Sequence, residues 1–227
     1  MRRFLNKWLY KKGYEIQKIG KTPHLLEQLI NKKGPLTFLQ IGANDGISFD
    51  NLYPIVTKYR CKGVVVEPLP DMFERLSLNF NHHKQIKPVR MAVHPTATTA
   101  EIYRVSKDRV DQYDDWCSGI ASFSKDHLLK HNVKEEDIEA EIVPCQPLMS
   151  LIAEQELVSV DYLQVDTEGF DHEILKMLDL ERIKPLIIKF EKVHTPASEF
   201  KKIREKLETH GYRIIDDTRD AIAVLES

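Results

Sequence analysis

Short apolar runs alternate with amphipathic segments along most of the chain from residue 36 onward. The apolar runs, such as residues 36–41 and 63–67, have the length of buried strands, and the intervening segments repeat apolar residues at helical spacing. Strand–helix alternation produces a mostly parallel sheet with helices on both faces. Because ligands of such sheets bind beyond the carboxyl ends of the strands, the residues that end each strand are the first candidates for function.

The same patterns predict individual elements. Strands are expected at residues 36–41, 63–67, 86–93, 101–105, 160–166, 186–191, 212–215 and 221–225. Helices are expected at residues 51–59, 71–80, 148–156, 171–178 and 198–210. Residues 106–141 interrupt the alternation, since they are polar and carry both charges. We interpret them as an inserted lid segment with a short helix near residues 125–131, and a disordered loop is the alternative.

Charge and cysteine content argue against several classes of protein. Among 227 residues, 33 are basic and 35 acidic, and the formal net charge of −2 does not suit a nucleic-acid-binding surface. Cys61, Cys117 and Cys145 are far apart and form no C-x-x-C pair, which argues against disulfides and zinc–thiolate sites. No apolar run approaches the ~20 residues of a membrane span, and the start lacks the apolar core of a secretory signal. We therefore expect a cytoplasmic protein.

The start of the chain differs in charge from the remainder. Up to Lys21, seven residues are basic and only Glu15 is acidic. Apolar residues four apart, such as Phe4 and Trp8, would share one helical face. We interpret residues 1–33 as a basic amphipathic helical appendage to a domain that spans residues 34–227. Packing on its own domain or on a second subunit is one role, and peripheral contact of residues 1–21 with an anionic membrane is the other.

The first strand ends in a glycine-containing turn, residues 42–46 (G-A-N-D-G). Its glycines let the backbone turn tightly and let a ligand approach the main chain. The spacing is G-x-x-x-G, so the G-x-G-x-x-G fingerprint of nicotinamide and flavin enzymes is absent. Asn44 and Asp45 offer an amide and a carboxylate, which suit a cationic, zwitterionic ligand such as S-adenosylmethionine. A plain strand-to-helix turn is the alternative.

The second strand ends in Glu67, which Pro68 holds in an extended conformation. A carboxylate at the tip of the neighbouring strand can accept hydrogen bonds from both hydroxyls of an adenosine ribose. A surface acid at a strand end is the other interpretation. Together with the preceding turn, Glu67 indicates a nucleoside cofactor more strongly than either feature does alone.

Two later strand ends carry a cluster of titratable residues: Asp166, Glu168, Asp171, His172, Glu191 and His194. Methyl transfer to a hydroxyl needs a group that takes its proton, and His194 alone or paired with Glu191 suits this role. Asp166 with a neighbouring acid could instead hold a divalent metal that lowers the pKa of the hydroxyl. Helix capping is the alternative for several of these side chains.

Four segments together resemble the FkbM-type family of S-adenosylmethionine-dependent methyltransferases. They are residues 38–46 (F-L-Q-I-G-A-N-D-G), 64–68 (V-V-V-E-P), 162–171 (Y-L-Q-V-D-T-E-G-F-D) and 187–191 (I-I-K-F-E). The resemblance implies a class I methyltransferase fold: an α/β, Rossmann-like, mostly parallel seven-stranded sheet with one reversed strand and helices on both faces. It also implies O-methylation, commonly of a sugar hydroxyl in glycans or of a secondary-metabolite hydroxyl.

The resemblance also assigns roles by position. Residues for the methionine part of the cofactor are Gln40, Gly42, Ala43, Asn44, Asp45 and Gly46. Those for its nucleoside part are Glu67, Pro68, Ala92 and Val93. Asp166 and Glu168 would lie where the methyl group is transferred. Gln40 departs from the family, since many members have an acid there, and residues 147–149 replace a common leucine–aspartate pair.

We therefore expect an O-methyltransferase of a sugar hydroxyl in a glycan, with Asp166, Glu191 and His194 activating or positioning the acceptor. Whether a divalent metal binds Asp166 and Glu168 is left open. Trp116, in the insert, is either a platform for a sugar ring or part of the lid's packing. A secondary-metabolite acceptor and a non-catalytic cofactor-binding protein are the alternatives. The basic start would suit work on a lipid-linked glycan.

Overall fold

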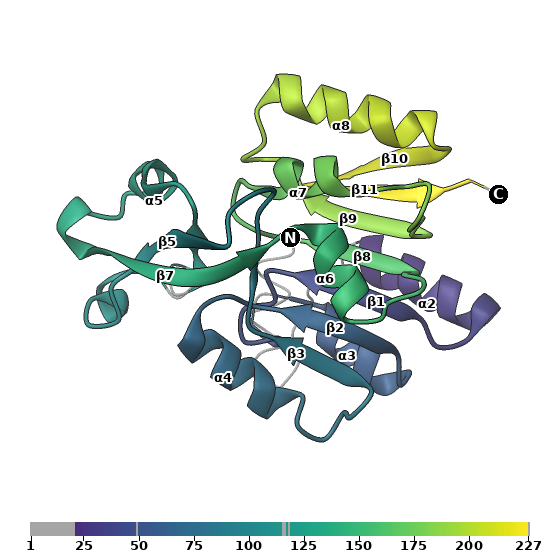
Figure 1. Ribbon diagram of the computed structural model, residues 1–227, viewed down its shortest axis with the longest axis horizontal. Helices are drawn as coiled ribbons and strands as arrows, with labels where there is room; N and C mark the ends of the chain where they lie inside the picture. Colours follow the sequence, from purple (N-terminus) through teal and green to yellow (C-terminus); the bar gives the residue numbers. More distant parts are fainter. Residues whose placement is uncertain (1–20, 49, 115–116, 118, 227) are drawn as a thin grey trace, which may run out of the picture.

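The computed structural model describes residues 21–48, 50–114, 117 and 119–226 (Figure 1). Its centre is a seven-stranded sheet in the order β10-β11-β9-β8-β1-β2-β3. These strands are β1 (Thr37–Ile41), β2 (Lys62–Val66), β3 (Ile86–Val89), β8 (Tyr162–Val165), β9 (Ile187–Glu191), β10 (Tyr212–Asp217) and β11 (Asp220–Leu225). Only β11 runs against its neighbours in this sheet, since it pairs antiparallel with both β9 and β10. The sequence prediction of a mostly parallel seven-stranded sheet with one reversed strand is confirmed.

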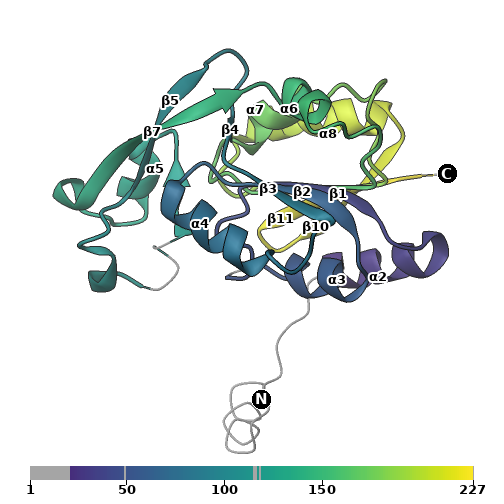
Figure 2. The same cartoon turned by 60° about the horizontal axis from the view of Figure 1, so that its bottom comes forward.

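Helices cover both faces of this sheet (Figure 2). One face packs on α2 (Lys21–Lys33), α3 (Leu52–Lys58) and α4 (Pro70–Asn79), and the other on α6 (Leu148–Glu154), α7 (Asp171–Met177) and α8 (Ala197–Thr209). The strands separate two apolar cores, because their residues alternate between the faces. In β1, Leu39 and Ile41 join one core while Phe38 joins the other. All three helices predicted beyond residue 140 are present within two residues of their expected bounds.

A second, four-stranded sheet projects beside the first, in the order β4-β7-β5-β6 (Figure 1). Its elements are β4 (Ala92–Val93), β5 (Thr99–Val105), β6 (Ala121–Ser122), α5 (Lys125–Lys130) and β7 (Ile138–Gln146). The insert is therefore a folded lobe over its described residues, and the short helix predicted near residues 125–131 is present. Buried Arg104 ties the lobe to α4, because its Nη1 lies 2.6 Å from Asp71 Oδ1.

One strand prediction in this region was wrong, and one long strand was missed. The strand expected at residues 86–93 is two strands, β3 and β4, which belong to different sheets. Strand β7 was missed, because it begins within the polar insert and pairs with β5 through residues such as Glu139 and Glu141. Polar residues suit an antiparallel strand with a solvated face, whereas the neighbouring parallel strands form apolar runs.

Part of the predicted appendage lies against the domain. Helix α2 buries Leu26 and Ile30 in the same core as residues of β1 and α3. Residues 1–20, with the Phe4 and Trp8 face proposed for membrane contact, lie outside the described residues, as does Trp116. The described helices include none long and apolar enough to cross a bilayer. Cys61, Cys117 and Cys145 are free and buried.

Leu26→Ala tests whether α2 belongs to the folded body of the domain. The Leu26 side chain is 1% exposed, so we expect the substitution to lower the free energy of unfolding by about 2–5 kcal/mol. Leu78→Ala is the matched control, because Leu78 is 61% exposed on α4 and its loss leaves no cavity. Urea unfolding measures the free energy of unfolding of both variants. Equal values would contradict the conclusion that α2 packs in the core.

Candidate functional site

The turn after β1 passes directly over the ends of two neighbouring strands. The backbone N–H groups of Gly42 and Ala43 both donate to the carbonyl oxygen of Val66 in β2, at 3.0 and 2.9 Å. On the other side, a Cβ at Gly42 would overlap the carbonyl oxygen of Asp166. Gly42 also has a φ of +77°, which side chains disfavour. Only glycine therefore fits at this position, and its main chain lines the cavity described below.

Glu67 holds the same turn from the end of β2. Its Oε2 accepts a hydrogen bond from the backbone N–H of Asn44 at 2.9 Å, and its Oε1 accepts one from Leu69 at 3.0 Å. Burial raises the pKa of Glu67 to about 7, although these two hydrogen bonds oppose the shift. Because each carboxylate oxygen has two lone pairs, the group keeps acceptor capacity for a ligand.

Asn44 presents an unused acceptor beside this carboxylate. Its side-chain Oδ1 is buried and has no partner among the described residues. Its backbone adopts the left-handed conformation, with a φ of +50°, which asparagine tolerates better than most residues. A buried polar atom without a partner is costly, so Asn44 Oδ1 is suited to a ligand donor.

Asp45 and Gly46, predicted to contact a cofactor, instead shape the turn. Asp45 Oδ1 accepts the backbone N–H groups of Ile47 and Ser48, and its Oδ2 accepts the Ser48 hydroxyl. Gly46 faces α4, where a Cβ would meet the side chains of Leu76 and Phe80 at 2.7 Å. Neither residue lines the cavity described below, because a turn-forming aspartate directs its carboxylate to its own backbone.

These strand ends border a cavity of about 390 Å³, which lies at the carboxyl edge of the large sheet. The predicted cofactor residues that line it are Gln40, Gly42, Ala43, Asn44, Glu67, Pro68, Ala92 and Val93. Beyond β2 the walls are apolar, since Met72, Met91, Ile102 and Phe123 face the cavity there. Over β1, β8 and β9 the lining is polar, so the cavity has two chemically different ends.

Asp50 lies at the polar end and was missed by the sequence analysis. Its Oδ2 accepts hydrogen bonds from Gln40 Nε2 at 2.5 Å and from Gln164 Nε2 at 3.1 Å. Gln40 and Gln164 sit side by side on the paired strands β1 and β8. Asp50 therefore places a carboxylate beside Gln40, where the resemblance led us to expect an acid. Lys189 of β9, 3.1 Å from Asp220, adds a positive charge at this end.

Asp166 follows β8 and opens onto the cavity. Asp166 is exposed to the cavity, and partial desolvation by the protein behind it, with the charges of Asp171 and Glu168, raises its pKa above the usual range. Asp171 is fully buried and accepts backbone hydrogen bonds from Thr167 and Glu191, so it braces the loop against β9. Burial raises the pKa of Asp171 to about 6.

Glu191 and His194 form a close pair at the end of β9. His194 Nδ1 lies 2.7 Å from Glu191 Oε2, and Arg219 donates to the other oxygen of Glu191 at 2.9 Å. Glu168, whose φ of +50° is unusual for glutamate, lies 3.7 Å from His194 Nδ1. Burial acts to raise the pKa of Glu168, but a hydrogen bond from His127 and nearby positive charges hold it below the usual range.

The predicted catalytic residues thus gather at one edge of the cavity, and Asp166 and Glu191 line it directly. Among the described residues, Glu168, Glu191 and His194 come close enough to share a cation, whereas Asp166 belongs to no such group. A metal pair on Asp166 and Glu168 stays a prediction. His127 and His131, from the insert, stand beside His194 and were missed.

The family model described as the Methyltransferase FkbM domain matches residues 40–214. No curated protein matches the chain in sequence. Among solved structures, the METTL16 MTase domain superposes with a TM-score of 0.49 at 12% identity over 90% of this chain and 66% of that one. A human methyltransferase 10 domain containing protein gives 0.46 at 13% identity over 99% and 95%. The fibrillarin pre-rRNA processing protein of Methanococcus jannaschii gives 0.42 at 15% identity over 86% and 68%.

Proposed function

The chain belongs to the FkbM family of methyltransferases, and we propose that it moves a methyl group from S-adenosylmethionine to a hydroxyl of a sugar in a glycan. The family assigns S-adenosylmethionine as the cofactor. The observation that supports hydroxyl transfer is the position of the Glu191–His194 pair at the edge of the cavity. This pair offers a base for the proton that a hydroxyl loses.

The residues present fit this cofactor at both ends of the cavity. Glu67 and Asn44 Oδ1 supply acceptors for ribose hydroxyls, and the apolar wall around Met72 and Phe123 suits an adenine ring. At the polar end, Asp50 suits an ammonium and Lys189 suits a carboxylate. Once bound, the cofactor supplies an electrophilic methyl group on a sulfonium.

The acceptor side of the cavity supports a polyhydroxylated substrate. The carboxyl groups of Asp166, Glu168 and Glu191 and the guanidinium of Arg219 line it. Carboxylates accept from sugar hydroxyls and a guanidinium donates to them, so this lining can orient one hydroxyl among several. A secondary-metabolite hydroxyl is the second candidate acceptor, since the same groups would also serve it. A protein that only binds the cofactor would have no use for the Glu191–His194 pair.

Two measurements test the proposal. Calorimetry with S-adenosylhomocysteine should give binding by the wild type, and absence of binding would overturn the cofactor assignment. Transfer of a labelled methyl group should then be seen with an oligosaccharide mixture, and acid hydrolysis should release a methoxy sugar. Label incorporated into an amine or carboxyl group instead would overturn O-methylation.

Asp50→Asn tests which end of the cavity holds the amino acid part of the cofactor. We expect S-adenosylhomocysteine to bind about tenfold more weakly, because one charge-assisted hydrogen bond is worth about 1.5–3 kcal/mol. 5′-Methylthioadenosine lacks the amino and carboxyl groups, so its affinity should stay unchanged. Calorimetry measures the affinity of both ligands. An equal loss of affinity for the two would mean that the amino acid part of the cofactor lies elsewhere.

A further inference from the structure

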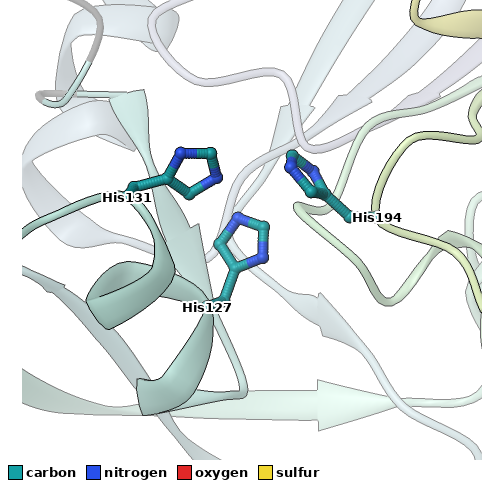
Figure 3. Close-up of side chains that lie close together, drawn as sticks. All are labelled: His127, His131 and His194. Carbon is teal, nitrogen blue, oxygen red and sulfur yellow. The ribbon is translucent and has the colours of Figure 1, made fainter.

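Three histidines from two separate parts of the chain converge beside the cavity (Figure 3). His127 and His131 come from α5 and its C-terminal end in the insert, and His194 follows β9 of the large sheet. Their ring centroids are 4.5 to 5.0 Å apart, and the three rings point toward a common centre. Residues four apart lie on the same face of a helix, which is why His127 and His131 approach the same point.

A carboxylate stands beside two of these histidines. Glu168 Oε2 lies 3.2 Å from His127 Nε2 and 3.7 Å from His194 Nδ1. The Ser122 hydroxyl of the insert donates to the carbonyl oxygen of Glu168, which fixes this loop under α5. Three imidazole nitrogens and one carboxylate oxygen are a donor set typical of zinc and of other divalent transition metals.

Glu191 and Arg219 give His194 an outer support. Glu191 Oε2 lies 2.7 Å from Nδ1 of His194, while Arg219 donates to the other carboxylate oxygen. When Nδ1 donates its proton to a carboxylate, the neutral ring keeps its lone pair on the other nitrogen. This carboxylate–histidine arrangement is the usual outer support of a metal-bound histidine.

The cluster is only partly open to water. His131 and His194 are half-buried. His127 is buried, 8% exposed, which limits the water available to its ring. A cation at the centre would bind donor atoms from both segments in a space that is only partly open to water.

We propose that His127, His131, His194 and Glu168 bind a divalent transition metal, with zinc as the expected ion, and that this metal fastens the insert to the carboxyl edge of the sheet. One donor atom from each histidine lies within 4.8 Å of the others, so side-chain shifts of about 1 Å reach the ~2.1 Å zinc–nitrogen distance. A metal here would stand beside the predicted acceptor position and would occupy the lone pair of His194. With the ion bound, the metal, which lowers the pKa of a bound hydroxyl, would therefore take over the role that the proposed function gives to His194 as a base. Its use in methyl transfer rests on the proposed function, whereas its binding does not.

The test is titration of chelator-treated protein with Zn²⁺ by calorimetry, and with Co²⁺ by visible absorption. We expect one ion per chain and intense cobalt bands of a four-coordinate site with nitrogen ligands. His131→Ala and His194→Ala should each weaken Zn²⁺ binding by roughly a hundredfold or more, since losing even an outer support costs about 10–100-fold. His82→Ala, which removes an exposed histidine after α4, is the matched control and should bind as the wild type does.

Thermal unfolding with and without Zn²⁺ provides the second readout. Zn²⁺ should raise the unfolding temperature of the wild type and of His82→Ala but not that of His131→Ala, because the ligands join two segments. Absence of Zn²⁺ binding by the wild type, or equal binding by His131→Ala, would overturn the metal site and leave the cluster as a proton-transfer group. Zn²⁺ binding without S-adenosylhomocysteine binding would sustain the metal site and overturn the proposed function.

Discussion

Gly42→Ala is expected to abolish binding of S-adenosylhomocysteine, lowering affinity by a hundredfold or more, or about 2.7 kcal/mol. The added Cβ would overlap the carbonyl oxygen of Asp166, so the turn after β1 and the strand end of β8 must separate. That separation moves the two sides of the cavity apart and breaks the hydrogen bonds from Gly42 and Ala43 to Val66. Calorimetry measures the affinity, and thermal unfolding measures the accompanying loss of stability.

Gly34→Ala is the control that distinguishes the effect of steric overlap at Gly42 from the effect of backbone strain. Gly34 also has a positive φ, +92°, but a Cβ there meets no atom within 4 Å. A left-handed alanine costs about 1–2 kcal/mol, which corresponds to roughly 2–8 °C in unfolding temperature for a chain of this size. Cofactor affinity should be unchanged in Gly34→Ala. A Gly42→Ala protein that binds S-adenosylhomocysteine as the wild type does would contradict the role given to this turn.

The sheet and the strand ends that border the cavity could be predicted because they depend on local patterns. Parallel strands buried on both faces form apolar runs, and the residues that stop those runs must meet at one edge of the sheet. Gly42, Asn44 and Glu67 were found in this way, and the structure brings them together around the cavity.

The remainder of the site depends on contacts that no local pattern encodes. Asp50 enters the cavity because Gln40 and Gln164, on paired strands, both donate to it. His127 and His131 reach His194 because α5 follows β6, which pairs with β5 and is joined to the sheet edge by the Ser122–Glu168 hydrogen bond. The one local signal for them was the spacing of two histidines four residues apart.

Asp45 shows the opposite error, in which a suitable residue type was given the wrong partner. A carboxylate directly after a buried strand suggested a ligand contact, yet it accepts the backbone N–H groups of Ile47 and Ser48. Aspartate in a turn closes such rings with its own backbone, and sequence alone does not separate this use from ligand binding. Asp50, five residues later, is the carboxylate from this part of the chain that lines the cavity.

Glu67→Gln is expected to weaken binding of both S-adenosylhomocysteine and 5′-methylthioadenosine by about 30–100-fold, because both ligands carry the ribose. The carboxamide keeps the size of the side chain. However, its NH₂ group must face one of the two backbone donors, Asn44 or Leu69, that the carboxylate accepts. The pattern differs from that of Asp50→Asn, which should affect only the ligand with an amino acid part.

The pH dependence of binding gives a second, independent measure of Glu67. The ionised carboxylate is the better acceptor for ribose hydroxyls, and burial raises its pKa to about 7. Affinity for 5′-methylthioadenosine should therefore rise between pH 6 and pH 8 and level off above, with a tenfold deficit at about one unit below the pKa. Glu67→Gln should lose this pH dependence, whereas Glu74→Gln, an exposed glutamate on α4, should retain both the affinity and its pH profile. A pH profile that survives in Glu67→Gln would assign the titration to another group and contradict the ribose contact.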